Sequence, residues 1–204
     1  MKKFLLLVLL GCAVHSINAQ EIYFYSGKNL TNYRFKNNSS ASHTVLQSGS
    51  GDFYEIGYSM PLKYDNFNYT IGLSLNEYNA VGSSAINTYT WNTDYLGVVN
   101  AVNYTFFNKY DFDVSVKGGI GLSTIIYGKQ NTNGAYFDLL SQKEFSGIFI
   151  QPVFGFQTKY NISSNSYLSF GYNFSKSINL FNSSNEHLSF NNNQFQFGVH
   201  FVTK

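Results

Sequence analysis

Apolar and polar residues alternate along most of the chain beyond residue 20, and this period of two is typical of β-strands. In the clearest run, residues 67–76, the apolar residues Phe67, Tyr69 and Ile71 alternate with Asn, Thr and Gly. The same alternation predicts further strands at 54–62, 95–106, 112–122, 148–160, 168–174 and 195–202. A strand at about 22–35 completes a set of eight, although its pattern leaves open which of its side chains share a face.

The connections between these strands alternate in length. Three of them are short, at 63–66, 108–111 and 161–166. Four polar stretches are long, at 36–52, 77–93, 128–144 and 177–192. This order predicts an all-β fold, an eight-stranded antiparallel up-and-down transmembrane β-barrel with short periplasmic turns and long extracellular loops.

A soluble eight-stranded barrel such as a lipocalin would show the same alternation, with its apolar face turned inward. Charged residues make up only 12% of the chain, and aromatic residues make up 19%. The outer face of a soluble barrel usually carries many Lys and Glu residues. The polar face here consists mainly of Gly, Ser, Asn and Gln, which suit a narrow interior. The composition therefore favours the membrane barrel.

Aromatic residues gather at both ends of the predicted apolar band, as they do in the two interfacial girdles of a membrane barrel. Next to the short turns stand Phe67, Phe106, Phe107, Phe112, Tyr160 and Tyr167. Next to the long loops stand Tyr78, Tyr95 and Tyr127.

Residues 1–19 are predicted to be a secretory signal peptide that precedes a barrel domain at 20–204. Two lysines stand before a short apolar core, and the small residue Ala19 ends a plausible cleavage site. The apolar core is too short to span a membrane as a helix. The alternative is a lipoprotein signal, in which Cys12 would carry the lipid.

In its strand and loop order the chain resembles the small eight-stranded outer-membrane proteins of the OmpA/OmpX type, over residues 22–201. The resemblance implies a location in the outer membrane, with outer-membrane lipid around the barrel. The Asn-, Tyr- and Lys-rich composition and the Ala19–Gln20 junction resemble an envelope protein of the Bacteroidota. One departure concerns the last residues, because barrels of this type usually end in an aromatic residue and this chain places Phe201 before Val-Thr-Lys.

Several classes of chemistry are disfavoured by the composition. Without Lys2 and Lys3 of the signal, 11 basic residues face 11 acidic ones, which removes the electrostatic case for nucleic-acid binding. A single cysteine cannot form an intramolecular disulfide. We expect no cofactor and no metal site, because the four histidines are scattered; they are His15, His43, His187 and His200.

Two pairs of opposite charges fall on the small-residue face and are predicted to lie inside the barrel. Glu55 and Lys117 stand at similar distances from their short turns, so a lumen ion pair is expected. Asp113 and Lys159 stand at the short-turn ends of adjacent strands and are expected to pair as well. We interpret these charges as structural parts of a filled core, with a proton path or gate as the alternative.

An enzyme that modifies lipid A is the main alternative function. Glu186, His187 and Ser189 bring an acid, a base and a nucleophile together in the last predicted loop, and the His-x-Ser spacing resembles that of lipid A 3-O-deacylases. That family, however, places its acid about a strand further on, where this chain has Phe and Val. Neighbours in sequence also form no triad unless the base reaches the hydroxyl. We therefore expect these residues to be part of a loop and assign no catalytic residue.

The sequence thus predicts a non-catalytic outer-membrane barrel that acts through its surface loops or through contacts with a protein partner. Adhesion, envelope organisation and membership of an outer-membrane assembly all fit this description. The third long loop is the candidate contact loop, because exposed apolar residues often mark contacts. Its apolar residues are Tyr136, Phe137, Leu139 and Leu140.

Overall fold

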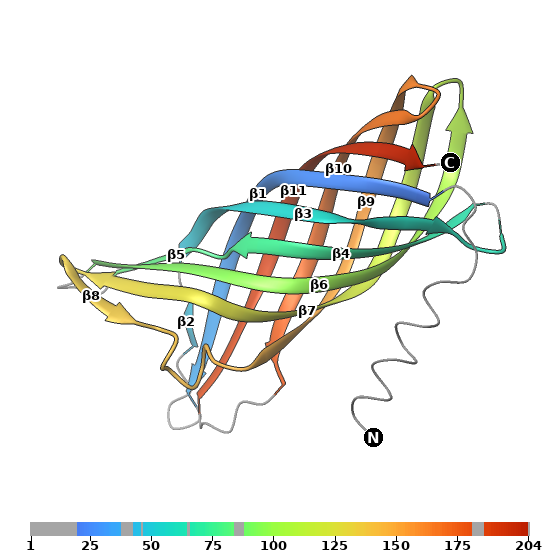
Figure 1. The fold of residues 1–204 in the computed structure, drawn as a ribbon. Coiled ribbons are helices and arrows are strands. Elements are labelled where there is room, and N and C mark those ends of the chain that lie inside the picture. The colour runs from blue at the N-terminus through green and yellow to red at the C-terminus, as the bar shows by residue number, and fades with distance from the viewer. Residues whose placement is uncertain are drawn as a thin grey trace.

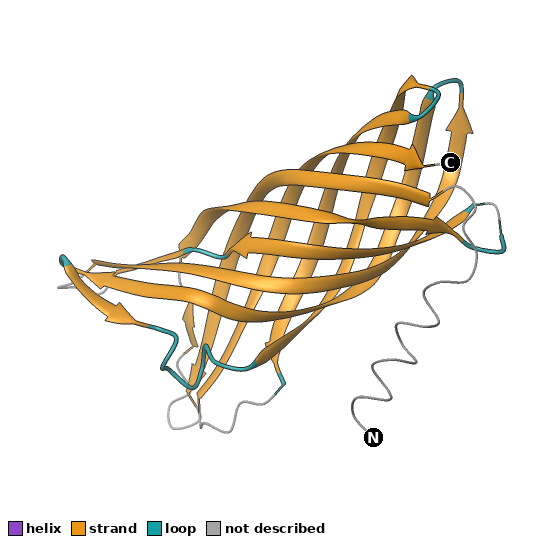
Figure 2. Ribbon diagram, in the orientation of Figure 1, coloured by secondary structure: helices purple, strands orange, loops and turns teal. Residues whose placement is uncertain are grey.

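The computed structural model describes residues 20–37, 43–45, 47–64, 66–83, 88–180 and 186–203. The predicted signal peptide and Cys12 lie outside this part of the chain. The described residues form eleven β-strands (Figures 1 and 2): β1 (Gln20–Asn37), β2 (His43–Val45), β3 (Gln47–Pro61), β4 (Phe67–Glu77), β5 (Ala80–Ser83), β6 (Thr88–Lys109), β7 (Phe112–Thr132), β8 (Ala135–Asp138), β9 (Ile148–Ser163), β10 (Ser166–Asn179) and β11 (Glu186–Thr203). None of the described segments is a helix long and apolar enough to cross a membrane.

Eight long strands close into a ring in which every neighbour is antiparallel. The order is β1-β11-β10-β9-β7-β6-β4-β3, and β3 pairs back to β1. The short strands β2, β5 and β8 extend the ends of this ring on one side, and the C-terminus lies at the opposite end (Figure 1). The predicted eight-stranded barrel is confirmed.

The strands of this ring are staggered, and the stagger sets the width of the barrel. Following paired residues around the ring from Glu21 of β1, through β3, β4, β6, β7, β9, β10 and β11, leads back to Thr31, ten residues further along the same strand. Such a stagger tilts the strands against the barrel axis, and eight tilted strands enclose an interior that side chains can fill.

Small and polar side chains point inward, and large apolar side chains point outward. In β4 the buried residues are Thr70, Gly72, Ser74 and Asn76, and the apolar residues between them are exposed. The same division holds in β3, where Ile56 and Tyr58 face outward. A soluble barrel would have the opposite arrangement, because an apolar outer wall is costly in water. The outer wall is therefore built to face lipid.

The structure defines the face of β1 that the sequence left open, because Tyr23, Tyr25, Asn29, Thr31 and Tyr33 are its buried residues. This face is part of the interior. Three aromatic residues predicted for the outer girdles also belong to the interior, namely Tyr78, Tyr95 and Tyr167. The reason is their parity: each stands two residues from a small or polar side chain that faces inward, which are Asn76, Gly97 and Ser169.

The long connections contain more strand than the sequence predicts. β7 continues to Thr132 and turns through Asn133 and Gly134, both with positive φ, into β8. Two successive positive φ values are typical of a tight hairpin turn. β11 begins at Glu186, so the predicted loop at 177–192 is largely strand. At the long-loop end, the barrel wall therefore extends beyond the segments in which apolar and polar residues alternate most clearly.

Because the ring is closed, no strand edge of the barrel wall is free for detergent to attack. The unheated protein should migrate faster on a denaturing gel than the heated protein, since a closed barrel stays compact until heat opens it. Identical migration before and after heating would contradict a closed ring.

Candidate functional site

The lumen is closed at the long-loop end by a cluster of packed side chains, which we call the aromatic plug. Its buried members are Tyr33, Tyr78, Ala80, Trp91, Tyr95, Ile125, Leu139, Phe145, Phe149, Leu188 and Phe190. Trp91 contacts Tyr33 and Phe145 edge-on, with ring centroids 5.3 and 5.0 Å apart. Leu139 and Phe145 come from the segment between β8 and β9, so this loop folds back over the mouth of the barrel.

Below the plug the lumen is filled by an amide network. Asn29 donates to Asn76 Oδ1, and it accepts hydrogen bonds from Asn192 and Gln194 at 2.8 and 3.1 Å. Asn173 donates to Gln194 and to Gln196. Because an amide can both donate and accept, a few side chains hydrogen-bond to one another here, although Asn173 Oδ1 and Gln196 Nε2 have no partner among the described residues.

Glu55 and Lys117 are both buried, as predicted, and face one small cavity of about 20 Å³. They do not form a direct ion pair. Glu55 instead accepts a hydrogen bond of 2.8 Å from the Tyr23 hydroxyl, and the Lys117 ammonium lies 5.8 Å from the centre of the Tyr25 ring. The cavity between the two charges has room for one water molecule.

The tyrosine that contacts Glu55 requires glycines on the two strands beside it, because Gly57 of β3 is its register partner and Gly72 of β4 follows. A Cβ atom added at Gly57 or Gly72 would stand 2.4 or 2.6 Å from the Tyr23 hydroxyl oxygen. The two residues are paired across β3 and β4. Their missing side chains therefore create the space in which the Tyr23 ring lies over β3 and β4 on the inner wall.

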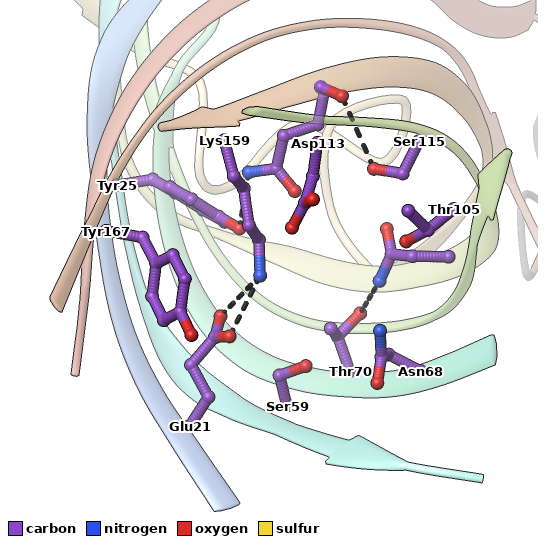
Figure 3. A pocket seen from close by; sticks show the side chains of 12 residues that line it. Glu21, Tyr25, Ser59, Asn68, Thr70, Thr105, Asp113, Ser115, Lys159 and Tyr167 are labelled. Carbon is purple, nitrogen blue, oxygen red and sulfur yellow. Dashed lines mark hydrogen bonds and ion pairs between the residues drawn. The ribbon is translucent and has the colours of Figure 1, made fainter. Parts of the chain in front are cut away.

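At the short-turn end the lumen widens into a polar cavity of about 120 Å³, which we call the periplasmic chamber (Figure 3). Its walls are formed by Glu21, Tyr25, Ser59, Asn68, Thr70, Asn103, Thr105, Asp113, Ser115, Gln157, Lys159 and Tyr167. Hydroxyl, amide and carboxylate groups predominate, so the chamber suits water or a small polar ligand.

The ion pair of this chamber differs from the predicted one. Lys159 Nζ donates to both carboxylate oxygens of Glu21, at 2.7 and 2.9 Å (Figure 3). Asp113 is the register partner of Lys159 on β7 and lines the same chamber, but it forms no ion pair with another described residue. Lys159 reaches across the lumen to Glu21. The Glu21 carboxylate is held in place there by its second contact, with His200.

His200 connects Glu21 to a serine. Its Nδ1 contacts Glu21 Oε1, and its Nε2 lies 2.7 Å from Ser169 Oγ. This is the hydrogen-bond order of a Ser-His-acid triad. Ser169 does not line the chamber, however, and Tyr25 stands at the chamber wall with its ring edge-on to His200 at 5.3 Å. The Glu21–His200–Ser169 relay can hold a proton and orient the His200 ring. A substrate in the chamber, however, could not reach the Ser169 hydroxyl.

Glu186, His187 and Ser189, which the sequence offers as an alternative catalytic group, are not part of this relay. The side chains of Glu186 and His187 lie outside the described residues. Ser189 belongs to β11 and stands between the buried Leu188 and Phe190, so it is on the outer face. No group of three or more His, Cys, Asp and Glu side chains in the described part of the chain could hold a metal ion.

The predicted contact loop divides into two parts. Tyr136 and Phe137 lie in β8 and are 69% and 54% exposed. Leu139 is 4% exposed and belongs to the aromatic plug, whereas Leu140 is exposed. Of the four predicted contact residues, Leu139 thus helps to seal the lumen, and the other three are exposed.

No protein-family model matches the sequence, and no curated protein matches it. Among solved structures, the chain is similar to Neisserial surface protein A, with a TM-score of 0.51 and 12% identity, over 87% of this chain and 96% of that one. It is also similar to a major outer membrane protein from Thermus thermophilus, with a TM-score of 0.50 and 9% identity, over 91% and 100%. A third structure, Ail, the attachment invasion locus protein of Yersinia pestis, has a TM-score of 0.44 and 12% identity, over 90% and 100%.

The protein has the fold of a small outer-membrane β-barrel. Its apolar outer wall fits the same location, the outer membrane, in which the short turns face the periplasm and the long loops face outward. The structural relatives do not support an assignment to the Bacteroidota.

Breaking the Glu21–Lys159 pair should destabilise the barrel. Glu21→Gln leaves Lys159 without its carboxylate partner, and we expect the free energy of unfolding to fall by roughly 3 kcal/mol. This is the lower end of the range for breaking a buried ion pair, because the chamber is partly hydrated. Lys159→Met should cost a similar amount, and the double variant should cost less than the sum of the two. Urea unfolding from lipid vesicles measures all three.

The matched control is the same cycle with Glu55→Gln and Lys117→Met. Because a cavity separates these two charges, their coupling free energy should be smaller than that of Glu21 and Lys159. An equal or larger coupling would mean that Glu55 and Lys117 meet directly.

Proposed function

We propose that the protein is a non-catalytic outer-membrane barrel that acts on the cell surface through its loops. The filled lumen supports this proposal. The aromatic plug covers the long-loop end, and the amide network fills the level below it. A transport function would need a continuous path for solute, whereas the packed side chains occupy that path.

The observation that carries the proposal is the hairpin formed by β7 and β8, which extends beyond the ring (Figure 1). Tyr136 and Phe137 expose large rings there although the loop buries Leu139 a few residues later. β8 pairs only with β7 among the described strands, so its other edge is free to hydrogen-bond. A free strand edge with exposed aromatic side chains is suited to binding an extended segment of a protein partner.

A photo-crosslinking residue placed at Tyr136 or Phe137 should join the protein to one partner on intact cells. The control position is Gln142, which is exposed in the same loop but lies outside the hairpin. The variant Tyr136→Ser/Phe137→Ser should weaken the complex about thirty-fold, since aromatic anchors at interfaces often contribute about 2 kcal/mol or more. No cross-link from either hairpin position, with the barrel correctly inserted, would contradict the proposal.

A hydrolase is the second candidate function, because Ser169, His200 and Glu21 are connected in the order of a catalytic triad. The burial of Ser169 and the position of Tyr25 favour a structural role for this relay.

A fluorophosphonate probe should therefore leave Ser169 unlabelled in the folded protein. Lipid A acylation should be the same in cells with the unaltered protein and in cells with Ser169→Ala, His187→Ala or Ser189→Ala. Labelling that Ser169→Ala abolishes, or a lipid A change in any variant that still inserts, would make the protein an enzyme.

A further inference from the structure

The outer wall becomes more polar near the long loops on the neighbouring strands β11 and β10 and at the same level of β1. Toward the short turns the outward residues of β10 and β11 are apolar, as in Phe197 and Phe195, whereas β1 also carries Ser26 and Lys28 on its outer face. Beyond Phe195 the outward residues of β11 are Asn193, Asn191 and Ser189. The neighbouring strands carry exposed cations at this level, Lys176 on β10 and Arg34 on β1.

The strand register places these side chains in two neighbouring rows. Lys176 pairs with Asn191, which pairs with Asn32 of β1. Two residues further on, Arg34 pairs with Ser189. Two strand spacings and two residues separate the Cα atoms of Arg34 and Lys176, which corresponds to roughly 12 Å. Two long cationic side chains on that spacing can reach the same headgroup, with amide and hydroxyl groups between them.

Lys176 stands in apolar surroundings on the lipid-facing wall. Phe174 and Ile178, the outward residues before and after it on β10, are both exposed. Neither Lys176 nor Arg34 forms an ion pair with another described residue. Lys28, an outward cation of β1 nearer the short turns, differs because Asp52 of β3 pairs with it. Of these three cations, Lys28 has a carboxylate partner, and Arg34 and Lys176 have none among the described residues.

A cation among apolar, lipid-facing residues is costly unless an anion accompanies it. At this height the molecules beside the wall are lipids of the outer leaflet, and their phosphates are anions of matching chemistry. Arg and Lys both bind phosphate strongly, Arg through paired N–H donors. We propose that Arg34 and Lys176, with Asn32, Asn191 and Ser189, form a binding site for the phosphorylated headgroup of an outer-leaflet lipid.

The test uses the whole barrel in nanodiscs of phosphatidylcholine that contain either diphosphorylated or dephosphorylated lipid A. Lipid retained after transfer to mild detergent is counted by native mass spectrometry. The unaltered protein should retain the diphosphorylated form at least ten-fold more than the dephosphorylated form. Arg34→Gln/Lys176→Gln should reduce this preference to less than two-fold, and Arg34→Lys/Lys176→Arg should keep it.

The matched control is Lys143→Gln, which removes a positive charge from an exposed loop position and should leave the preference unchanged. A double Gln variant that keeps the preference, or a Lys143→Gln variant that loses it equally, would overturn the site. A phosphorylated glucosamine disaccharide without acyl chains, added in solution, distinguishes a free anion from a lipid. Displacement of the lipid by this disaccharide at equal concentration would overturn the assignment to a lipid.

A second measurement requires no variant. Acetylation of Lys176 by a soluble reagent should be at least five-fold slower in discs with diphosphorylated lipid A than in discs with the dephosphorylated form. Lys28 provides the internal control, because its carboxylate partner belongs to the chain itself. Equal acetylation of Lys176 in both discs would contradict the proposal.

Discussion

The closure of eight staggered strands into one ring is the constraint on which the rest of the structure depends. It fixes a narrow interior, and a narrow interior has to be filled by the side chains that alternate inward. Space in the lumen is so limited that one large ring needs glycines on the strands beside it, as Tyr23 does with Gly57 and Gly72. The choice between a pore and a filled barrel is therefore largely decided by which residues occupy the inward positions.

Polarity changes along the axis of this filled interior. Aromatic rings pack at the long-loop end, and amides hydrogen-bond to each other in the middle, where Glu55 and Lys117 share their cavity. Glu21, Asp113 and Lys159 line the larger chamber, where a charge is least costly because hydration remains. On the outer wall the order is different: apolar residues predominate, and single polar residues interrupt them, such as Asn100 of β6, Lys28 of β1 and Asn191 of β11. Function is thus expected at the outer ends and on the lipid-facing wall.

Alternation in the sequence was sufficient to predict the ring, the orientation of Glu55 and Lys117, and the short turns. It could not predict which charges meet. Glu21 and His200 are 179 residues apart, and the register of the first and last strands alone brings them together. Asp113 and Lys159 are register partners, as expected, yet a flexible lysine selects its partner across the lumen. The sequence assigns Tyr95 to the outer girdle, whereas the structure buries it in the lumen. The type of residue does not show which face it occupies where the alternation of a strand becomes irregular.

The position of Glu21 has a consequence for the order of assembly. Its two partners lie on β9 and on the last strand, β11, whereas Glu21 itself lies on the first. Contacts between residues so far apart in sequence form slowly, and the contact of Glu21 with His200 requires that the first and last strands have paired. The Glu21 cluster is thus a latch, because its contact with His200 engages only in a completed ring.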